Sequence, residues 1–335
     1  MQISSTSADF KQTFSEFHSQ IEQTLLSAFN SRFPDSLYHP IMYLFEGGGK
    51  RLRPILTMVA AGAVGNNPND ALQSGVAMEI LHNFTLVHDD IMDKSPIRRG
   101  RETIHKRWNE SAAILSGDVM IGIAYQLIIS STCSKPRFAD ILTSFTQGLV
   151  QVCEGQAIDM DFQHQANVSM DEYIGMIEKK TARLLEMSAA IGGFVGNGSA
   201  EQNAALRKFA LHLGIAFQIQ DDLLDLTAQQ HELGKFIGQD IVEGKKTYLI
   251  IRATEKATDE HHRVLLKNFY DEKGLSGTFI EQMKTMMNEL GVFADAQHEV
   301  NRQLESACSA LEALPRNYYT SMLEWITTIV NERKK

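Results

Sequence analysis

The chain has 335 residues and a formal net charge of −9, which argues against a protein that binds nucleic acid through a general basic surface. Its three cysteines, Cys133, Cys153 and Cys308, are too widely spaced for a disulfide framework or a zinc site, so we expect a reducing, cytoplasmic location. No stretch approaches about 18 consecutive apolar residues, and no basic segment precedes an apolar core near the N-terminus, so we expect neither a membrane span nor a secretion signal.

The first predicted element is a helix with an apolar stripe. The helix has few basic residues, so we expect the stripe to pack on a helical body rather than on a membrane surface. Its apolar side chains recur at helical spacing and are Phe10, Phe14, Phe17, Ile21 and Leu25.

The remaining elements are also predicted to be helical, because Ala, Leu, Ile, Met, Glu and Gln dominate and only 7 prolines occur. After a Gly-rich break at 46–49, a basic helix is predicted to start at Lys50. The next long helix runs to Asp93, and Asn69 or Asp70 could cap its first turn. No linker and no fixed-period repeat occurs, so one all-α domain over residues 1–335 is the simplest account. Later helical segments are predicted at roughly 109–132, 137–164, 170–196, 201–227 and 247–335.

Two copies of one aspartate pattern are the most informative motif, Asp89-Asp90-Ile-Met-Asp93 and Asp221-Asp222-Leu-Leu-Asp225. In each copy the first and last carboxylates lie four residues apart, and thus on one helix face, where like charges repel by roughly tenths of a kcal/mol. Solvated acidic faces are the ordinary alternative, but both copies end largely apolar segments. Carboxylates without a nearby cysteine cluster suit a hard cation, so the pattern indicates Mg²⁺.

Basic residues interrupt the acidic composition in four places. Gly47-Gly-Gly-Lys50 is not a P-loop, because Arg51 follows the lysine and the flanks are predicted to be helical. Lys50 and Arg53 are expected to share one face at a helix start, where backbone N–H groups also favour an anion. Metal-holding acidic pairs together with arginines that bind phosphate oxygens describe a site for diphosphates. The four groups are Lys50-Arg51-Leu-Arg53, Arg98-Arg99-Gly-Arg101, Lys179-Lys180, and Lys235 with Lys245-Lys246.

Histidines lie beside the first motif. His82 precedes Asp89 by seven residues and so shares the face of that carboxylate, although a histidine at such a place is more often part of a core. His88 is roughly 100° round the helix from Asp89, and we interpret it either as structural or as a residue that supports the metal ligands from behind.

These elements resemble the trans-isoprenyl diphosphate synthases, and the similarity covers the chain from about Gly47 to Thr247. The resemblance implies a helical bundle around a deep central cavity, usually in a homodimer. It also implies head-to-tail condensation of isopentenyl diphosphate with an allylic diphosphate. The elements in family order are GGGKRLRP at 47–54, LHNFTLVHDDIMDKSPIRRG at 81–100, GD at 117–118, KT at 180–181, FQIQDDLLD at 217–225 and GKFIGQDIVEGKKT at 234–247.

Site roles follow from the resemblance residue by residue. More than one Mg²⁺ ion would bridge the allylic diphosphate through Asp89, Asp93 and Asp221, with Asp225 as a further metal ligand, and Asp90 and Asp222 would complete or orient that shell. Arg98, Lys180 and Lys235 would contact the allylic diphosphate, while Lys50, Arg53, His82 and Arg99 would hold isopentenyl diphosphate. Thr181 and Gln218 would lie by the reacting carbons, and Lys245 would close over the site.

Product length depends on where an apolar cavity is blocked, because each five-carbon unit gains roughly 4 kcal/mol of burial. The family rule uses the positions four and five residues before the first motif, Thr85 and Phe84. A bulky residue at the fifth position with a small one at the fourth resembles geranylgeranyl (C20) synthases. Farnesyl (C15) and longer (C25) products stay open.

Three alternatives compete with this interpretation. A terpene cyclase would use an aspartate motif and Mg²⁺ but would not need Lys50, Arg53 and Arg99. A non-catalytic synthase subunit typically lacks motif aspartates, and all six are present here. A structural metal-binding bundle is the third alternative.

Overall fold

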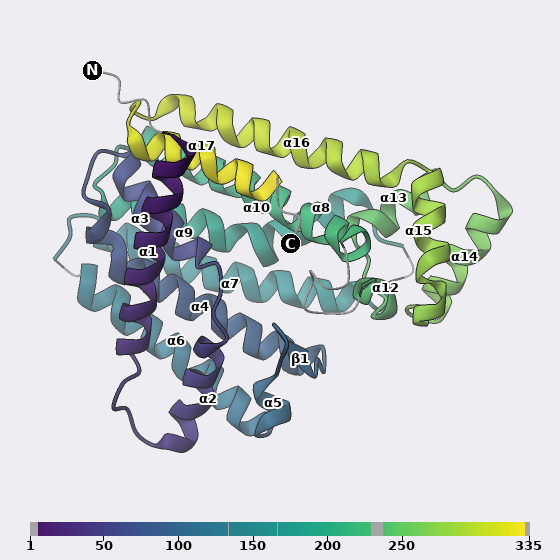
Figure 1. Ribbon diagram of the computed structural model, residues 1–335, viewed down its shortest axis with the longest axis horizontal. Coiled ribbons are helices and arrows are strands. Elements are labelled where there is room, and N and C mark those ends of the chain that lie inside the picture. The colour runs from purple at the N-terminus through teal and green to yellow at the C-terminus, as the bar shows by residue number, and fades with distance from the viewer. Residues whose placement is uncertain (1–5, 133, 166, 229–236, 332–335) are drawn as a thin grey trace. The chain divides into compact units, whose positions relative to one another are not determined.

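The computed structural model describes residues 6–132, 134–165, 167–228 and 237–331, and it is almost entirely helical (Figure 1). Among these residues the only strands are β1 (Ile97–Arg98) and β2 (Arg101–Glu102), which pair antiparallel with Ile97 opposite Glu102. The chain divides into two compact units that interleave along the sequence. Unit 1 contains Met1–Leu149, Leu184–Lys208 and Ala310–Ile326, and unit 2 contains Val150–Arg183, Phe209–Ser309 and Thr327–Lys335.

Unit 1 is built around α4, which packs along α6 and α3, while α1 lies against both α3 and α4 (Figure 1). A 3-10 turn at Pro68–Ala71 leads into α4. The helices that lie wholly or largely in this unit are α1 (Ser7–Ser27), α2 (Asp35–Glu46), α3 (Leu52–Ala63), α4 (Leu72–Met92), α5 (Ile104–Arg107), α6 (Glu110–Thr132), α9 (Arg183–Val195) and α17 (Tyr318–Asn331).

The apolar stripe of α1 packs as the sequence predicts. A capping box of Thr6 and Asp9 starts the helix, because each side chain accepts a hydrogen bond from the backbone N–H of the other residue. The ring of Phe10 contacts Tyr318 and Trp325 of α17, with centroids 5.1 and 5.9 Å apart. The stripe therefore fixes α1 to the C-terminal helix of the same unit.

Two predicted helix starts in unit 1 are wrong. Helix α3 begins at Leu52 rather than Lys50, since Arg51 is its N-cap and has a left-handed backbone with φ of 49°. Neither Asn69 nor Asp70 caps α4, because Asn67 caps the preceding 3-10 turn and Ala71 precedes α4 without a side-chain cap. A left-handed residue and a 3-10 turn both interrupt regular α-helix, and the spacing of apolar residues does not predict either of them.

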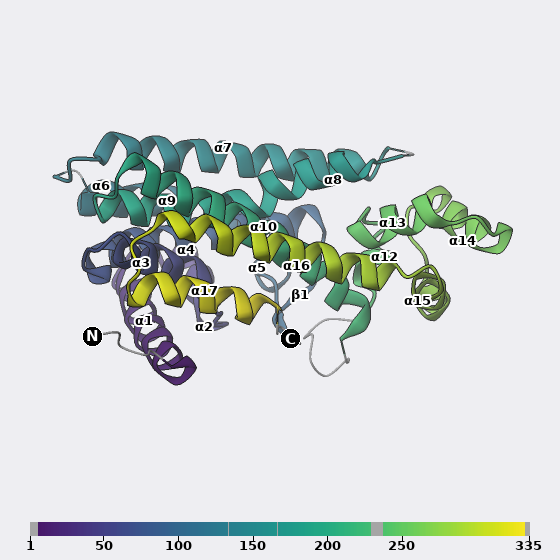
Figure 2. The same ribbon diagram turned by 90° about the horizontal axis from the view of Figure 1, so that it is seen from above.

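Unit 2 gathers the helices that follow the second aspartate motif. Helices α13, α14 and α15 lie together in both views (Figures 1 and 2), and α13 also packs on α8. Helices α7, α10 and α16 contribute residues to both units. The elements are α7 (Phe138–Phe162), α8 (Met170–Ile177), a π-helical segment (Glu178–Ala182), α10 (Ala200–Thr227), α12 (Gln239–Val242), α13 (Tyr248–Lys256), α14 (Glu260–Asp271), α15 (Ile280–Glu289) and α16 (Val292–Ala310), with 3-10 turns at Gly277–Phe279 and Leu311–Ala313.

The all-α prediction is confirmed, and the helical segments predicted near 109–132, 137–164 and 201–227 correspond to α6, α7 and α10. The segment predicted at 170–196 contains the π-helical residues 178–182 between α8 and α9. The assignment of residues 1–335 to a single domain stays a prediction.

Helix α6 is the one described helix whose length and composition would allow it to cross a membrane. Less than half of its most apolar stretch is buried, and its buried face packs along α4. The core helix of a soluble protein has the same properties, so the expected absence of a membrane span stays a prediction.

Candidate active site

The first aspartate motif closes the C-terminal end of α4 in unit 1. Asp93 is the C-cap, and its N–H donates to the carbonyl of Asp89 at 2.8 Å, so the two residues lie one turn apart as the spacing predicts. Both side chains are partly buried. The pair therefore presents two carboxylates from one helix end.

Asp90, between them, faces inward and forms an ion pair with Arg98 of the β hairpin. The guanidinium Nε lies 2.8 and 3.0 Å from the two carboxylate oxygens, and Nη2 lies 2.8 Å from Oδ1. Burial raises the pKa of Asp90, and the ion pair with Arg98 opposes that shift. Asp90 thus anchors the hairpin against the motif, while Arg98 stays about one-third exposed and can meet a second anion.

His82 lies on α4 about two turns before Asp89, and four arginines from other segments lie near it. Burial lowers the pKa of His82 well below its usual value, and the charges of Arg53, Arg99, Arg98 and Arg51 lower it further. Its Nδ1 is buried, with no hydrogen-bond partner in the part of the chain that the structure describes. Arg53, His82 and Arg99, three of the four residues predicted to hold isopentenyl diphosphate, therefore lie with Arg51 and Arg98 in one basic cluster inside unit 1.

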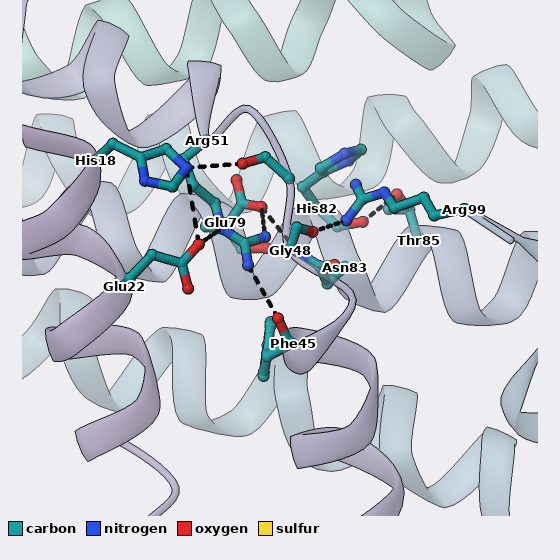
Figure 3. A network of polar contacts seen from close by, with 11 residues as sticks. His18, Glu22, Phe45, Gly48, Arg51, Glu79, His82, Asn83, Thr85 and Arg99 are labelled. Atoms are coloured by element: carbon teal, nitrogen blue, oxygen red, sulfur yellow. Dashed lines mark hydrogen bonds and ion pairs between the residues drawn. The ribbon is translucent and has the colours of Figure 1, made fainter. Parts of the chain in front are cut away.

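The hairpin and the Gly-rich loop of residues 47–49 meet at this cluster. The Nη1 of Arg99 donates to the carbonyl of Gly48 (Figure 3). Arg98 and Arg99 also line a pocket together with Asp90 and Gly47. Arg99 has a left-handed backbone with φ of 52°, which turns its side chain toward the loop within the two-residue hairpin connection.

The two predicted chain-length residues lie near the middle of the same α4 helix. Phe84 is buried, and its ring packs edge-on against His88 with centroids 5.0 Å apart. The Thr85 hydroxyl donates to the carbonyl of His82 at 2.7 Å. A Cβ at Gly117 of α6 would lie 2.1 Å from Nε2 of His88, so this glycine lets α6 approach α4 closely. This close packing agrees with a structural role for His88, which stays a prediction.

In unit 2 the second motif is held by hydrogen bonds to its middle aspartate. Asp222 accepts hydrogen bonds from the Tyr173 hydroxyl at 2.5 Å, the Gln218 amide at 3.0 Å and the N–H of Tyr248 at 3.1 Å. Burial, followed by the charge of Asp240, raises the pKa of Asp222 to about 7. The predicted orienting role of Asp222 is consistent with this geometry.

The same chain of contacts reaches two predicted residues at the reacting carbons. The Thr181 hydroxyl donates to Oε1 of Gln218 at 2.8 Å, and the Gln218 amide donates to Asp222. Thr181 lies in the π-helical segment between α8 and α9. The structure therefore brings Thr181 and Gln218 together and fixes the direction of the Gln218 amide.

Asp225 supports the segment after the second motif. Its Oδ2 accepts from the N–H of Asp240 at 3.2 Å, and its backbone carbonyl accepts from Gly238 at 2.8 Å. Only 1% of the residue is exposed, which favours an anchoring role, and its predicted contact with metal stays a prediction. Lys235 lies outside the described residues. Lys245 follows the same segment and forms an ion pair with Glu243 at 2.8 Å.

Lys180 has a partner that the sequence analysis missed. Its Nζ lies 2.5 Å from Oδ2 of Asp159 on α7, and neighbouring Lys179 contacts Glu154 at 2.6 Å. A Cβ at Gly155 would lie 2.3 Å from the backbone nitrogen of Lys180, so this glycine lets α7 touch the π-helical segment. The cluster of acidic and amide residues at 154–161, near the end of α7, was the available signal for Asp159.

Known proteins resemble this chain over most of its length. The polyprenyl synthetase family model matches residues 34–287. A geranylgeranyl diphosphate synthase from Methanosarcina mazei is 43% identical over 223 residues, which cover 67% of this chain and 69% of that protein. A geranylfarnesyl diphosphate synthase from Natronomonas pharaonis is 33% identical over 316 residues, covering 90% of this chain and 91% of that protein. The crystal structure of a geranylgeranyl pyrophosphate synthetase from Pyrococcus horikoshii matches with a TM-score of 0.89 at 32% identity, covering 97% of this chain and 99% of that one.

The chain belongs to the polyprenyl synthetase family. It is accordingly an isoprenyl diphosphate synthase, which is a prenyltransferase. The helical fold is that of the solved family members. The family resemblance drawn from the ordered sequence elements is confirmed.

The donor set of each aspartate motif fits a divalent cation that arrives with a diphosphate. No three His, Cys, Asp or Glu side chains lie together as a metal cage within the described ranges. Mg²⁺ is usually bound by one or two carboxylates, while waters and substrate phosphates supply the other oxygens. Asp89 and Asp93 offer such a pair, so a divalent metal fits these polyprenyl synthetase residues.

Proposed function

We propose that the protein condenses isopentenyl diphosphate head to tail with allylic diphosphates and that its main product is geranylgeranyl diphosphate. The observation that carries this proposal is the placement on α4 of a carboxylate pair, Asp89 and Asp93, close to the basic cluster around His82. One substrate diphosphate can meet the carboxylates through metal, and a second can meet the arginines directly. A cyclase, which binds one diphosphate, would not require the second group.

In this mechanism unit 1 binds both kinds of anion. Bound Mg²⁺ would neutralise the leaving diphosphate as the allylic C–O bond breaks, and Asp89 and Asp93 would hold it. Arg98, already fixed by Asp90, would contact the same diphosphate. Lys50, Arg53, His82 and Arg99 would orient isopentenyl diphosphate so that its alkene meets the allylic cation, which is catalysis by positioning.

Residues of unit 2 would serve the allylic substrate. Lys180 would exchange its ion pair with Asp159 for a diphosphate oxygen, and Asp221 would hold metal. Thr181 and Gln218 would lie beside the cation, where the hydrogen bonds from Thr181 to Gln218 and from Gln218 to Asp222 fix their polar atoms. Lys235 and Lys245 would also contact the diphosphate. An apolar cavity would exclude water, which would otherwise trap the cation as an alcohol.

The product length is tested by Phe84→Ala. If buried Phe84 stops elongation, its removal should lengthen the main product by at least one isoprene unit, because each unit gains about 4 kcal/mol of burial. Thr85→Phe should shift products toward C15, and both variants should keep the ionisation chemistry. Chromatography of dephosphorylated products, with isopentenyl diphosphate and each allylic primer, measures this. An unchanged distribution for Phe84→Ala would place the block elsewhere, for example near Ile121–Tyr125 of α6.

We further propose a cytoplasmic homodimer that pairs through α6. Three large apolar side chains on this helix are 44–57% exposed, namely Ile114, Leu115 and Ile129. Only two charged residues occur along its 23 residues, so a second copy of the chain is a suitable cover for the exposed face. Cys308 forms no disulfide within the described residues, which suits a reducing compartment. Sedimentation equilibrium would give the subunit number.

A further inference from the structure

Arg51 occupies an unusual place between two residues that are predicted to bind substrate, Lys50 and Arg53. It has a left-handed backbone with φ of 49°, and only 2% of the residue is exposed. A residue with a Cβ is strained in this region, and a buried guanidinium loses its hydration. A strained backbone and a buried charge persist together only where surrounding contacts stabilise them, and such positions cluster at functional sites.

Three acceptors from three segments surround the guanidinium (Figure 3). Nε donates to Glu22 of α1 at 2.6 Å, Nη1 donates to Glu79 of α4 at 2.7 Å, and Nη2 donates to the carbonyl of Phe45 at 3.3 Å. Glu79 is 3% exposed and also accepts from Asn83 at 3.0 Å. Because its side chain is buried and already binds two carboxylates, Arg51 is poorly placed to bind a substrate diphosphate itself.

The loop before Arg51 is held from two further directions. His18 of α1 donates from Nε2 to the carbonyl of Gly49 at 2.8 Å, and Arg99 of the hairpin donates to the carbonyl of Gly48 (Figure 3). A Cβ at Gly49 would lie 3.0 Å from Nη1 of both Arg51 and Arg99, so a side chain at this position would crowd the two guanidiniums. Lys50 therefore lies between two anchored residues.

We propose that Arg51 is a positioning residue that sets the affinity for isopentenyl diphosphate. With Glu22, Glu79 and His18 it fixes the backbone from which Lys50 and Arg53 reach the substrate. Helix α1 thereby takes part in substrate binding without touching the substrate. This inference rests on the proposed assignment of Lys50 and Arg53 to isopentenyl diphosphate.

Positioning and simple electrostatics predict opposite results for Glu22. Removing its negative charge near an anion site should strengthen the binding of a diphosphate if only the field matters. If Glu22 acts by holding Arg51, its removal should weaken that binding, because small displacements of binding groups are costly. The sign of the change in KM therefore separates the two explanations.

The experiment compares Glu22→Gln with Glu16→Gln in the full-length enzyme. Both substitutions remove one carboxylate charge from α1, but Glu16 accepts a hydrogen bond from Gln12 on the exposed side of the helix. Glu22→Gln should raise KM for isopentenyl diphosphate about tenfold. KM for the allylic primer and kcat should stay within about twofold. Glu16→Gln should change none of these constants.

His18 gives a second, independent variant pair. His18→Leu removes the donor to Gly49 and should also raise KM for isopentenyl diphosphate, whereas His18→Gln keeps an N–H donor at a similar reach and should restore it in part. Recovery by the conservative variant would not be expected if His18 only filled space. Because this pair leaves Arg51 itself unchanged, the positioning role can be tested without a substitution of that buried residue.

Three outcomes would overturn the inference. They are a lower KM for isopentenyl diphosphate in Glu22→Gln, equal rises in both KM values, or unchanged kinetics in both Glu22→Gln and His18→Leu. A wild-type enzyme that does not consume isopentenyl diphosphate would instead refute the proposed function. An active wild-type enzyme with normal variants would refute the positioning role alone.

Discussion

The two aspartate motifs share one spacing but are anchored by different chemistry. In unit 1, Asp90 pairs with the guanidinium of Arg98. In unit 2, Asp222 accepts from the Tyr173 hydroxyl and two neutral N–H donors, and burial together with the charge of Asp240 raises its pKa to about 7. A motif of the same letters can thus orient its outer carboxylates with either a cation or neutral donors, depending on which side chains the local fold supplies.

The largest expected effect concerns an outer aspartate of the first motif. Asp89→Ala should lower kcat by roughly 10²–10³-fold, because a metal that stabilises the leaving diphosphate would lose a ligand. The fold should survive, since the substitution removes a carboxylate that repels Asp93 across one helical turn. Steady-state assays and thermal unfolding measure the two quantities, and a chelator should abolish wild-type activity.

The control for that prediction is Asp35→Ala, which removes an exposed carboxylate from α2 of the same unit. It should leave kcat unchanged. Near-normal turnover of Asp89→Ala in the presence of metal would contradict the metal role of the first motif.

The middle aspartates allow a direct test of the two anchoring modes. Asp222→Ala should lower the free energy of unfolding by about 2–4 kcal/mol, because three donors lose a buried acceptor. Asp90→Ala should cost only about 1–2 kcal/mol, since Arg98 is 32% exposed and water can solvate it once its partner is gone. Urea unfolding of both variants measures the difference. A larger loss for Asp90→Ala would show that the charged anchor is the stronger one.

Substitutions of the basic residues should change KM for one substrate and not for the other. Arg53→Ala should raise KM mainly for isopentenyl diphosphate, and Lys180→Ala mainly for the allylic primer, each by about 10–100-fold for a lost charged hydrogen bond. Lys235→Ala should behave as Lys180→Ala does. The matched control is Lys179→Ala, because Lys179 also pairs with a carboxylate of α7 but has no predicted contact with either substrate. Equal or exchanged effects would mean that the assignment of these residues is wrong.

Periodicity and motif spacing predicted much of this fold. The apolar stripe from Phe10 to Leu25, the extents of α6, α7 and α10, and the i, i+4 pairing of Asp89 with Asp93 follow from local helical geometry. The basic cluster around His82 was also predictable, because its members belong to sequence elements to which the family resemblance assigns one shared site.

Contacts between distant segments were not predictable from one sequence. The Lys180–Asp159 ion pair joins residues 21 positions apart, and Arg51 meets Glu22 across 29 positions. The basic run from Lys50 to Arg53 has the composition of a helix start, yet Arg51, which is bound by Glu22 and the buried Glu79, has a left-handed backbone and the helix begins only at Leu52. These conformations depend on ion pairs between segments that are distant in the sequence, and the apolar periodicity of one segment carries no information about such pairs.

The smallest expected effect concerns His82, the counterpart in unit 1 of the titratable Asp222. Burial and the surrounding arginines disfavour its protonation, so the folded pKa lies well below that of an unfolded histidine, which is about 6.5. As the pH falls below about 6.5, the unfolded chain gains a proton that the folded chain refuses, and stability is lost. His82→Gln removes this term while keeping a polar side chain.

The free energy of unfolding should therefore fall more steeply between pH 7 and 5 for the wild type than for His82→Gln, by roughly 1 kcal/mol over that range. The difference between the two proteins isolates His82, because the other titrating groups contribute equally to both curves. Equal slopes would mean that His82 is protonated within the folded enzyme. The basic cluster would then carry one more positive charge at acidic pH, and KM for isopentenyl diphosphate should fall as the pH is lowered. The neutral His82 inferred from its arginine neighbours predicts no such fall.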